Sequence, residues 1–341
     1  MRAFRLTVAT ATLGLTWMGL GTAAAAPVVA TIAISPDIAA SHLVSMAAPP
    51  TTAECEAQFH IACYSPLQIQ QAYDLKPLYA KGYTGKGKTI IIVDSFGSPT
   101  IGQDLATFDS TYHLPAPPSF VVIQPAGPVP HPNPGWAGEA TLDVEYAHTI
   151  APGANILLVE TPTSENEGTT GFPQIVEAEN YVIDHHLGDV ISQSFSATEE
   201  TFPTKQSLLN LRGSYINAAK HNVTVLTASG DSGAADVHFN GETYYLHPVT
   251  SWPDSDPLVT GVGGTQLHLN AKGDHTAPDQ VWNDTYNTAT QEFIFGAPGP
   301  NALAGGGGKS IIFSRPSYQN GVPPTPVTSG SESGHDVTGC R

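Results

Sequence analysis

Short β-branched segments alternate with helical stretches along the central part of the chain. The expected strands are 89–93, 120–124, 155–160, 189–195, 223–227 and 258–267. The expected helices are 67–79, 99–112, 135–150, 172–187 and 205–220. Parallel strands need long crossovers, usually helices, so this alternation indicates a parallel sheet covered on both faces. The sequence therefore predicts an α/β fold with a mainly parallel sheet.

Two carboxylates lie one helical turn apart in the expected helix 135–150. Glu139 and Asp143 are four residues apart, which places their Cβ atoms about 5–6 Å from each other. Like charges at this spacing repel, so the two acids either lie on a solvated face or share a proton. In the second case one acid orients and tunes the other as a general base. The spacing alone leaves both interpretations open.

A third acid follows an expected strand. Asp231 comes soon after the strand 223–227, between Gly230 and Gly233, which let the backbone turn tightly and approach a ligand. In parallel sheets, binding and catalytic residues gather at the carboxyl ends of strands. Asp231 is therefore either an Asx-type turn residue or part of a site.

The chain is strongly acidic. It has 30 acidic and 13 basic residues among 341, a net charge of −17 at pH 7, and 40% hydrophobic residues. The hydrophobic content allows a buried core and argues against wholesale disorder. The charge argues against nucleic acid or an anionic membrane as a partner. Carboxylates protonate near about pH 4–5, so self-repulsion would fall in an acidic environment.

The N-terminal residues have the pattern of a secretory signal. Arginines precede an apolar stretch at 6–20, and alanines at 23–25 provide a small-residue cleavage site. We therefore expect a signal peptide over 1–25 and secretion to the extracellular space. Residues 26–64 have no clear period and are expected to form a leader or linker. No later stretch approaches the length of a membrane-spanning helix, so no membrane anchor is expected.

The chain has three cysteines. Cys55 and Cys63 are close in sequence and can close a small loop in an oxidising compartment. Cys340 would then remain unpaired, one residue from the end of the sequence.

A series of motifs extends over roughly residues 64–319. Its members are Tyr83–Gly87 leading into Thr89–Gly97, Gly138–Glu145, Ala151–Ala154, Ser229–Gly233, Trp252–Pro257, Val262–Thr265 and Gly305–Ser310. In this order they resemble the sedolisin family of serine-carboxyl peptidases, and the combination is highly specific. The resemblance implies a subtilisin-like three-layer fold over 65–319 and cleavage of proteins at acidic pH.

The same resemblance implies roles for the three acids. Glu139 would be the general base toward a serine nucleophile, Asp143 would hold and tune Glu139, and Asp231 would donate a proton to the oxyanion. A carboxylate base suits acidic pH, where a histidine would be cationic. An aspartate stabilises an oxyanion only as a neutral donor, which requires a raised pKa. The expected catalytic residues are therefore Glu139, Asp143 and Asp231.

The resemblance ends before the family's nucleophile. That serine lies in a Gly-Thr-Ser-type turn, and no serine after Ser310 has this setting. Ser310 lies in a glycine-rich segment that is not catalytic in the family. Residues 320–341 have few apolar side chains and are expected to be an unrelated, disordered tail. We therefore expect a C-terminally incomplete domain, explained by a frameshift or premature stop, with no nucleophile and with poor folding or an exposed apolar groove.

These expectations leave several functions open. The chain is either an acid endopeptidase of sedolisin type, a non-catalytic peptide-binding remnant, or an inactive gene fragment. The expected partner is a protein or peptide substrate, and the expected state is a monomer. No cofactor or metal is expected, because the family's calcium site would lie beyond the break. Asp94 is expected to be structural, because no His-Gly-Thr segment follows it to complete a Ser-His-Asp triad.

Overall fold

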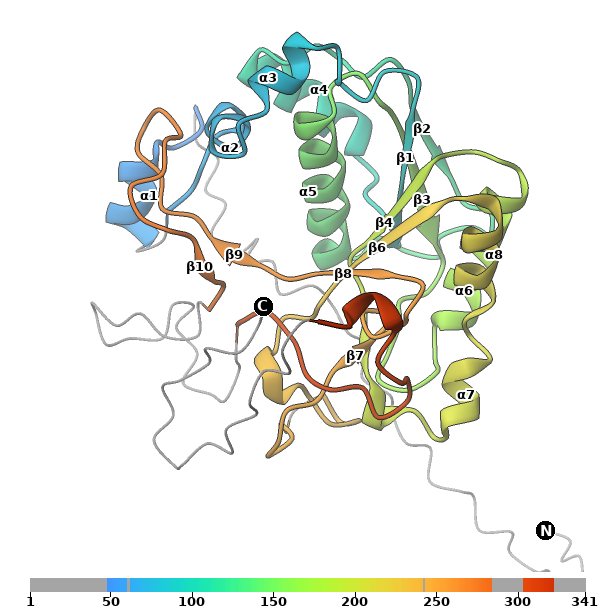
Figure 1. The fold of residues 1–341 in the computed structure, drawn as a ribbon. Coiled ribbons are helices and arrows are strands. Elements are labelled where there is room, and N and C mark those ends of the chain that lie inside the picture. Colours follow the sequence, from blue (N-terminus) through green and yellow to red (C-terminus); the bar gives the residue numbers. More distant parts are fainter. Residues whose placement is uncertain (1–47, 60–61, 242, 284–302, 322–341) are drawn as a thin grey trace, which may run out of the picture. The chain divides into compact units, whose positions relative to one another are not determined.

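A parallel sheet lies at the centre of the fold (Figure 1). The computed structural model describes residues 48–59, 62–241, 243–283 and 303–321. Within them the sheet has six strands in the order β2-β3-β1-β4-β6-β8, and every neighbouring pair is parallel. The strands are β1 (Thr89–Ser95), β2 (Phe120–Ile123), β3 (Asn155–Thr161), β4 (Val190–Gln193), β6 (Thr224–Ala228) and β8 (Thr260–Val262). The predicted α/β fold with a mainly parallel sheet is confirmed.

Helices cover both faces of this sheet. Alternate residues of β1 point to opposite faces, so Ile91 and Val93 enter one core while Ile92 enters another. The first core includes residues of α6 (Phe172–Asp184) and α8 (Gly213–His221). The second is built against α4 (Ile101–Tyr112) and α5 (Pro134–Ile150). Two cores on opposite faces of one sheet make the three layers that the sequence predicts.

Two expected helices are broken in the structure. The expected helix 67–79 forms α2 (Pro66–Ala72) and α3 (Lys76–Ala80), because Pro77 lacks an amide hydrogen and its ring clashes with the carbonyl group four residues earlier. The expected helix 205–220 forms α7 (Lys205–Leu209) and α8. Gly213, a poor helix former, lies at this second break.

The last expected strand is also divided. Gly263 and Gly264 separate β8 from β9 (Thr265–Gln266), which pairs antiparallel with β10 (Gln280–Val281). A second antiparallel pair joins β5 (Ala197–Thr198) to β7 (Ser251–Trp252). Short 3₁₀ helices occur at Glu199–Thr201, Gly233–Ala235 and Ser317–Gln319. No helix in the described part of the chain combines the length and apolar character needed to cross a membrane.

The segment before the first strand is tied to the rest of the fold. The helix α1 (Thr52–Phe59) lies in the stretch expected to be a leader or linker, and the predicted disulfide between Cys55 and Cys63 is confirmed. The Tyr64 hydroxyl donates to the Leu267 carbonyl (2.9 Å) and accepts from the Leu269 amide (3.2 Å). The Tyr64 carbonyl accepts from the Tyr146 hydroxyl of α5 (3.1 Å).

Several sequence expectations lie outside the described residues. They are the signal peptide over 1–25, Cys340, and the tail from residue 322 onward. These stay predictions.

Candidate active site

The helix α5 carries the paired acids and is fixed in position at its first turn. The Asn133 side chain accepts a hydrogen bond from the Trp136 amide (3.1 Å), and Pro134 occupies a first-turn position. Trp136 is 1% exposed. Ala140 and Val144 enter the core between α5 and the sheet. Glu139 and Asp143, each one residue before these core positions, are only partly buried.

A serine on the neighbouring strand meets both acids. Ser194 directly follows β4, and its hydroxyl donates to Asp143 Oδ2 (2.7 Å). The same hydroxyl is a hydrogen-bond partner of Glu139 and lowers the pKa of both carboxyls, against the larger effect of burial. The Ser194 hydroxyl therefore contacts both acids, which lie one helical turn apart on α5.

The two acids hold their protons more tightly than ordinary carboxyls. Burial, followed by the charge of Asp143, raises the pKa of Glu139 to about 8. Burial raises the pKa of Asp143 to about 6. A carboxyl whose partner is already ionised loses its proton late, so the pair carries a single negative charge between these two values. Burial of both carboxyls argues against two acids on a solvated face, and the proton-sharing role stays a prediction.

Asp231 belongs to the same site. It lies beyond the end of β6 and lines a pocket of about 410 Å³ together with Ser194, Gly263 and Trp282. Its charge contributes to the raised pKa of Glu139, so the two groups are within electrostatic reach of each other. The structure thus brings Asp231 near the two acids of α5, beside the carboxyl ends of β4 and β6.

Two further buried acids adjoin the site. Asp94 is the second-last residue of β1, pairs with Glu160 of β3, is fully buried, and neither of its carboxyl oxygens has a hydrogen-bond partner. Burial first, then the charges of Asp143 and Glu139, raise its pKa well above the ordinary value. Glu165, 1% exposed, has its pKa raised by burial and by the charges of Glu167 and Glu139. The sequence interpretation treats Asp94 as structural and does not consider Glu165.

The sequence contained a pattern that could have identified Asp94 as a candidate site residue. Its position at the end of a buried strand is the same kind of position as that of Asp231. No local pattern in the sequence predicts the contact of Ser194 with the acids, because this contact depends on the pairing of β4 beside β1.

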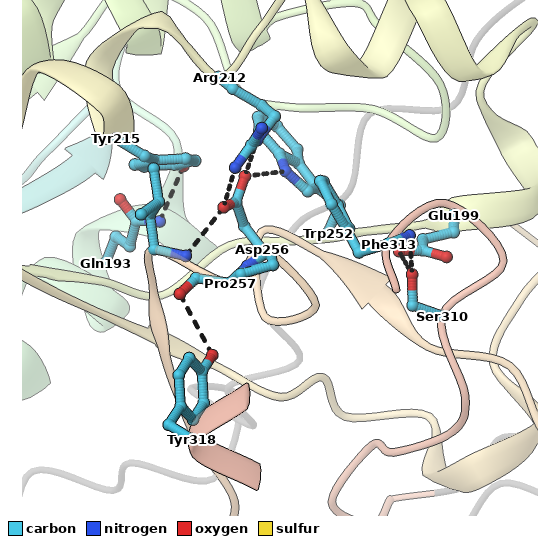
Figure 2. A network of polar contacts seen from close by, with 11 residues as sticks. Gln193, Glu199, Arg212, Tyr215, Trp252, Asp256, Pro257, Ser310, Phe313 and Tyr318 are labelled. Atoms are coloured by element: carbon cyan, nitrogen blue, oxygen red, sulfur yellow. Dashed lines mark hydrogen bonds and ion pairs between the residues drawn. The ribbon is translucent and has the colours of Figure 1, made fainter. Parts of the chain in front are cut away.

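Two later motifs of the series, Trp252–Pro257 and Gly305–Ser310, take part in a network of polar contacts (Figure 2). Asp256, 1% exposed, accepts hydrogen bonds from Arg212 Nε (2.5 Å) and Nη2 (2.8 Å). Asp256 also accepts from Trp252 Nε1 at 3.4 Å. The Tyr318 hydroxyl donates to the Pro257 carbonyl (3.2 Å). These contacts fix the loop between β7 and β8 against the start of α8.

Ser310 also has a structural position. Its hydroxyl donates to Glu199 Oε1 (2.7 Å) and accepts from the Phe313 amide (2.8 Å). Glu199 Oε2 accepts from the Ile311 amide (2.7 Å), so this buried carboxylate holds the turn that contains Ser310. The contacts agree with the expectation that Ser310 is not the nucleophile.

A metal site in the described residues would need several histidine, cysteine or acidic side chains close together. No group of three or more histidine, cysteine, aspartate or glutamate side chains there is arranged to hold a metal ion. The expectation of a site without cofactor or metal stays a prediction.

Comparisons with known proteins agree in pointing to one group of peptidases. No protein-family model matches the chain. Kumamolisin from Bacillus sp. (strain MN-32) is 31% identical over 282 residues, which cover 80% of this chain and 44% of kumamolisin. Sedolisin from Pseudomonas sp. (strain 101) is 26% identical over 270 residues, covering 77% of this chain and 42% of sedolisin. The chain thus matches less than half the length of these curated relatives.

Two further similarities extend the comparison. Human tripeptidyl-peptidase 1 is 30% identical over 188 residues, covering 54% of this chain and 28% of that protein. Among solved structures, Pseudomonas sedolisin, a serine-carboxyl proteinase complexed with two molecules of pseudo-iodotyrostatin, superposes with a TM-score of 0.60 and 25% identity. That superposition covers 76% of this chain and 67% of the sedolisin chain.

Proposed function

Since this chain belongs to the sedolisin family of serine-carboxyl peptidases, we propose that it hydrolyses protein or peptide substrates. Glu139 acts as the general base, Asp143 holds and tunes Glu139, and Asp231 donates a hydrogen bond to the oxyanion. One observation carries the proposal: Ser194, whose hydroxyl contacts both acids of the pair, lines a pocket that Asp231 also lines. The charge of Asp231 also acts on Glu139, so the three acids form one electrostatic group.

The chemistry follows from the charge state of the pair. The singly ionised pair removes the proton of an attacking serine hydroxyl, and Asp231 in its neutral form donates a hydrogen bond to the oxyanion that develops. The pair then returns the proton to the leaving amine. One such oxyanion donor is typically worth about 3–4 kcal/mol of transition-state stabilisation.

The pH range of this activity depends on the pKa of the pair. With pKa values of about 6 for Asp143 and about 8 for Glu139, the singly ionised form exists above about pH 6 and is lost below it. Cleavage at acidic pH, as the family resemblance implies, requires further hydrogen bonds to these carboxylates when substrate is bound. Such hydrogen bonds favour the ionised form and lower the pKa.

We further propose that the protein is secreted and acts as a monomer on protein or peptide substrates. The signal-like sequence over 1–25 supports secretion, and so does the Cys55–Cys63 disulfide, because disulfides persist in oxidising compartments.

The test is hydrolysis of an unfolded protein substrate by the full chain between pH 3 and pH 8. We expect cleavage by the wild type and a loss of about 100-fold or more in Glu139→Gln. Glu177→Gln, an exposed position on α6, is the control and is expected to keep full activity. Peptide binding measured by calorimetry without any cleavage would replace the proposal with the non-catalytic peptide-binding function.

A further inference from the structure

Basic side chains gather where the first strand of the sheet begins. The chain has thirteen basic residues, ten of which belong to the described residues, and four of these ten lie between residues 76 and 88. This stretch comprises α3 and the loop that leads into β1, at the top of Figure 1. We call its four lysines and two exposed apolar residues the lysine patch: Lys76, Leu78, Lys81, Tyr83, Lys86 and Lys88.

Backbone hydrogen bonds hold the lysine patch in place. The Tyr83 amide donates to the Leu78 carbonyl (3.0 Å) and closes the turn after α3. The Thr84 carbonyl accepts from the Gly153 amide (2.7 Å), which joins the loop to the turn between α5 and β3. A surface that is already ordered loses little conformational entropy when it binds a partner.

The positive charges of the lysine patch are only partly compensated. All four lysines are exposed, and the stretch that carries them contains no acidic residue. Lys88 forms an ion pair with Asp189 (2.6 Å), whereas the side chains of Lys81 and Lys86 have no hydrogen bond or ion pair with the described residues. The patch therefore keeps a net positive charge even beside Asp189 and Asp74, on a strongly acidic protein.

Two apolar side chains are exposed among these charges. Tyr83 is 68% exposed and Leu78 is 44% exposed. The hydrogen bond between their backbones places the two residues next to each other. Tyrosine is favoured at membrane–water interfaces, where its ring enters the headgroup layer and its hydroxyl stays hydrated. Exposed apolar residues in a basic setting are the pattern of a surface that lies on an anionic bilayer.

The acids of the candidate active site lie at the opposite end of the strands. β1 has seven residues, so about 20 Å separate its start beside the lysine patch from its end beside the site. The Debye length is about 8–10 Å at physiological ionic strength, so these acids do not cancel the field of the lysines. The net charge of −17 argues against an anionic partner for the chain as a whole, but the lysine patch is an exception at short range.

We propose that the lysine patch binds the surface of an anionic lipid bilayer. Its lysines contact the headgroup phosphates, while Tyr83 and Leu78 enter the interfacial layer. A soluble anionic polymer would pair with the lysines but would give these two side chains no apolar contact, so a lipid surface accounts for both kinds of residue. The bound protein then presents the opposite end of the sheet, with Glu139 and Asp231, away from the bilayer. This inference does not depend on the proposed peptidase function.

The test is co-sedimentation of the full chain with vesicles of phosphatidylglycerol and phosphatidylcholine in equal parts, at low salt and neutral pH. We expect binding to these vesicles, no binding to pure phosphatidylcholine, and release at about 1 M salt, where the Debye length falls to about 3 Å. Near an anionic surface one lysine contributes roughly 5-fold in affinity, so the charge reversal Lys86→Glu should weaken binding by roughly 20–30-fold. Tyr83→Ala should weaken binding by roughly 10-fold, because apolar burial is lost.

Lys309→Glu is the matched control, since it makes the same change in net charge at an exposed lysine beside the turn that Glu199 holds. Its binding should equal that of the wild type. Absence of wild-type binding to the anionic vesicles at low salt would overturn the proposal, and so would equal weakening by Lys86→Glu and Lys309→Glu. Vesicle binding that is unchanged in Tyr83→Ala and matched by binding to soluble dextran sulfate would replace the bilayer with an anionic polymer. Equal melting temperatures of the wild type and Lys86→Glu exclude misfolding as the cause of lost binding.

Discussion

Replacing Glu179 with glutamine should remove the contribution of this one carboxyl to the pH dependence of stability. Glu179 lies on α6 with 0% exposure, and neither carboxyl oxygen has a hydrogen-bond partner of normal geometry. Burial raises its pKa from 4.5 to about 8, although the nearby Ser214 hydroxyl lowers it somewhat. The folded protein therefore holds the proton of Glu179 more tightly than the unfolded chain does. The stability from this group is complete below about pH 4.5 and is lost as the pH rises toward 8.

The size of the effect follows from the two pKa values. A rise from 4.5 to about 8 corresponds to about 5 kcal/mol at pH above 8, and to about 3 kcal/mol at pH 7, where the folded carboxyl is still mostly protonated. Glutamine has nearly the same shape and no charge, so it should stabilise the protein at pH 7 by about 3 kcal/mol relative to its effect at pH 4. For a domain of this size that gain corresponds to roughly 6–12 °C in melting temperature.

The assay is urea denaturation of wild type and Glu179→Gln at pH 4 and pH 7, followed by circular dichroism. Glu177→Gln, on the exposed side of the same helix, is the control and should show no such difference. An equal change in stability at both pH values would refute the reasoning, because a change in packing or hydrogen bonding does not depend on pH in this way.

Three further predictions concern the site and its support. Asp143→Asn should lower the pKa of Glu139 below about 8 but leave it raised, because the neighbouring charge is lost while burial, the larger cause, remains; carbon-13 NMR titration of the glutamate carboxyls measures this directly. Asp231→Asn should retain more peptide hydrolysis than Asp231→Ala, since an amide still donates a hydrogen bond; equal inactivity of the two would argue against the donor role. Arg212→Ala should destabilise the fold by about 3–5 kcal/mol, because it leaves the buried Asp256 carboxylate without its cation; Arg212→Lys should recover part of this in thermal melts.

The strands were predictable from the sequence, but the order of the sheet was not. Continuous β-branched segments such as 89–93 identify buried strands wherever they occur. The position of β1 between β3 and β4 depends on long-range pairing that no local pattern encodes. For the same reason the spacing of Glu139 and Asp143 was visible in the sequence, whereas the contact of Ser194 with both was not.

The periodicity of apolar residues also did not predict where two of the helices are broken. That periodicity extends across residues 73–75 and 210–212, where the structure ends one helix and begins another. At the second break, Arg212 forms its ion pair with Asp256, a residue 44 positions away. Here a tertiary contact and a neighbouring glycine accompany a break in a pattern that favours a continuous helix.

The contacts of Tyr64 restrict how far the chain can be shortened from its N-terminal side. This tyrosine lies in the stretch expected to be a leader, yet its hydroxyl and carbonyl join the segment at 267–269 to Tyr146 on the helix of the paired acids. A protease that trims the leader must therefore cut upstream of residue 64 to leave the alignment of that helix intact. Shorter variants designed to start at α2 (Pro66–Ala72) would lose this three-way anchor, although every acid of the site would still be present.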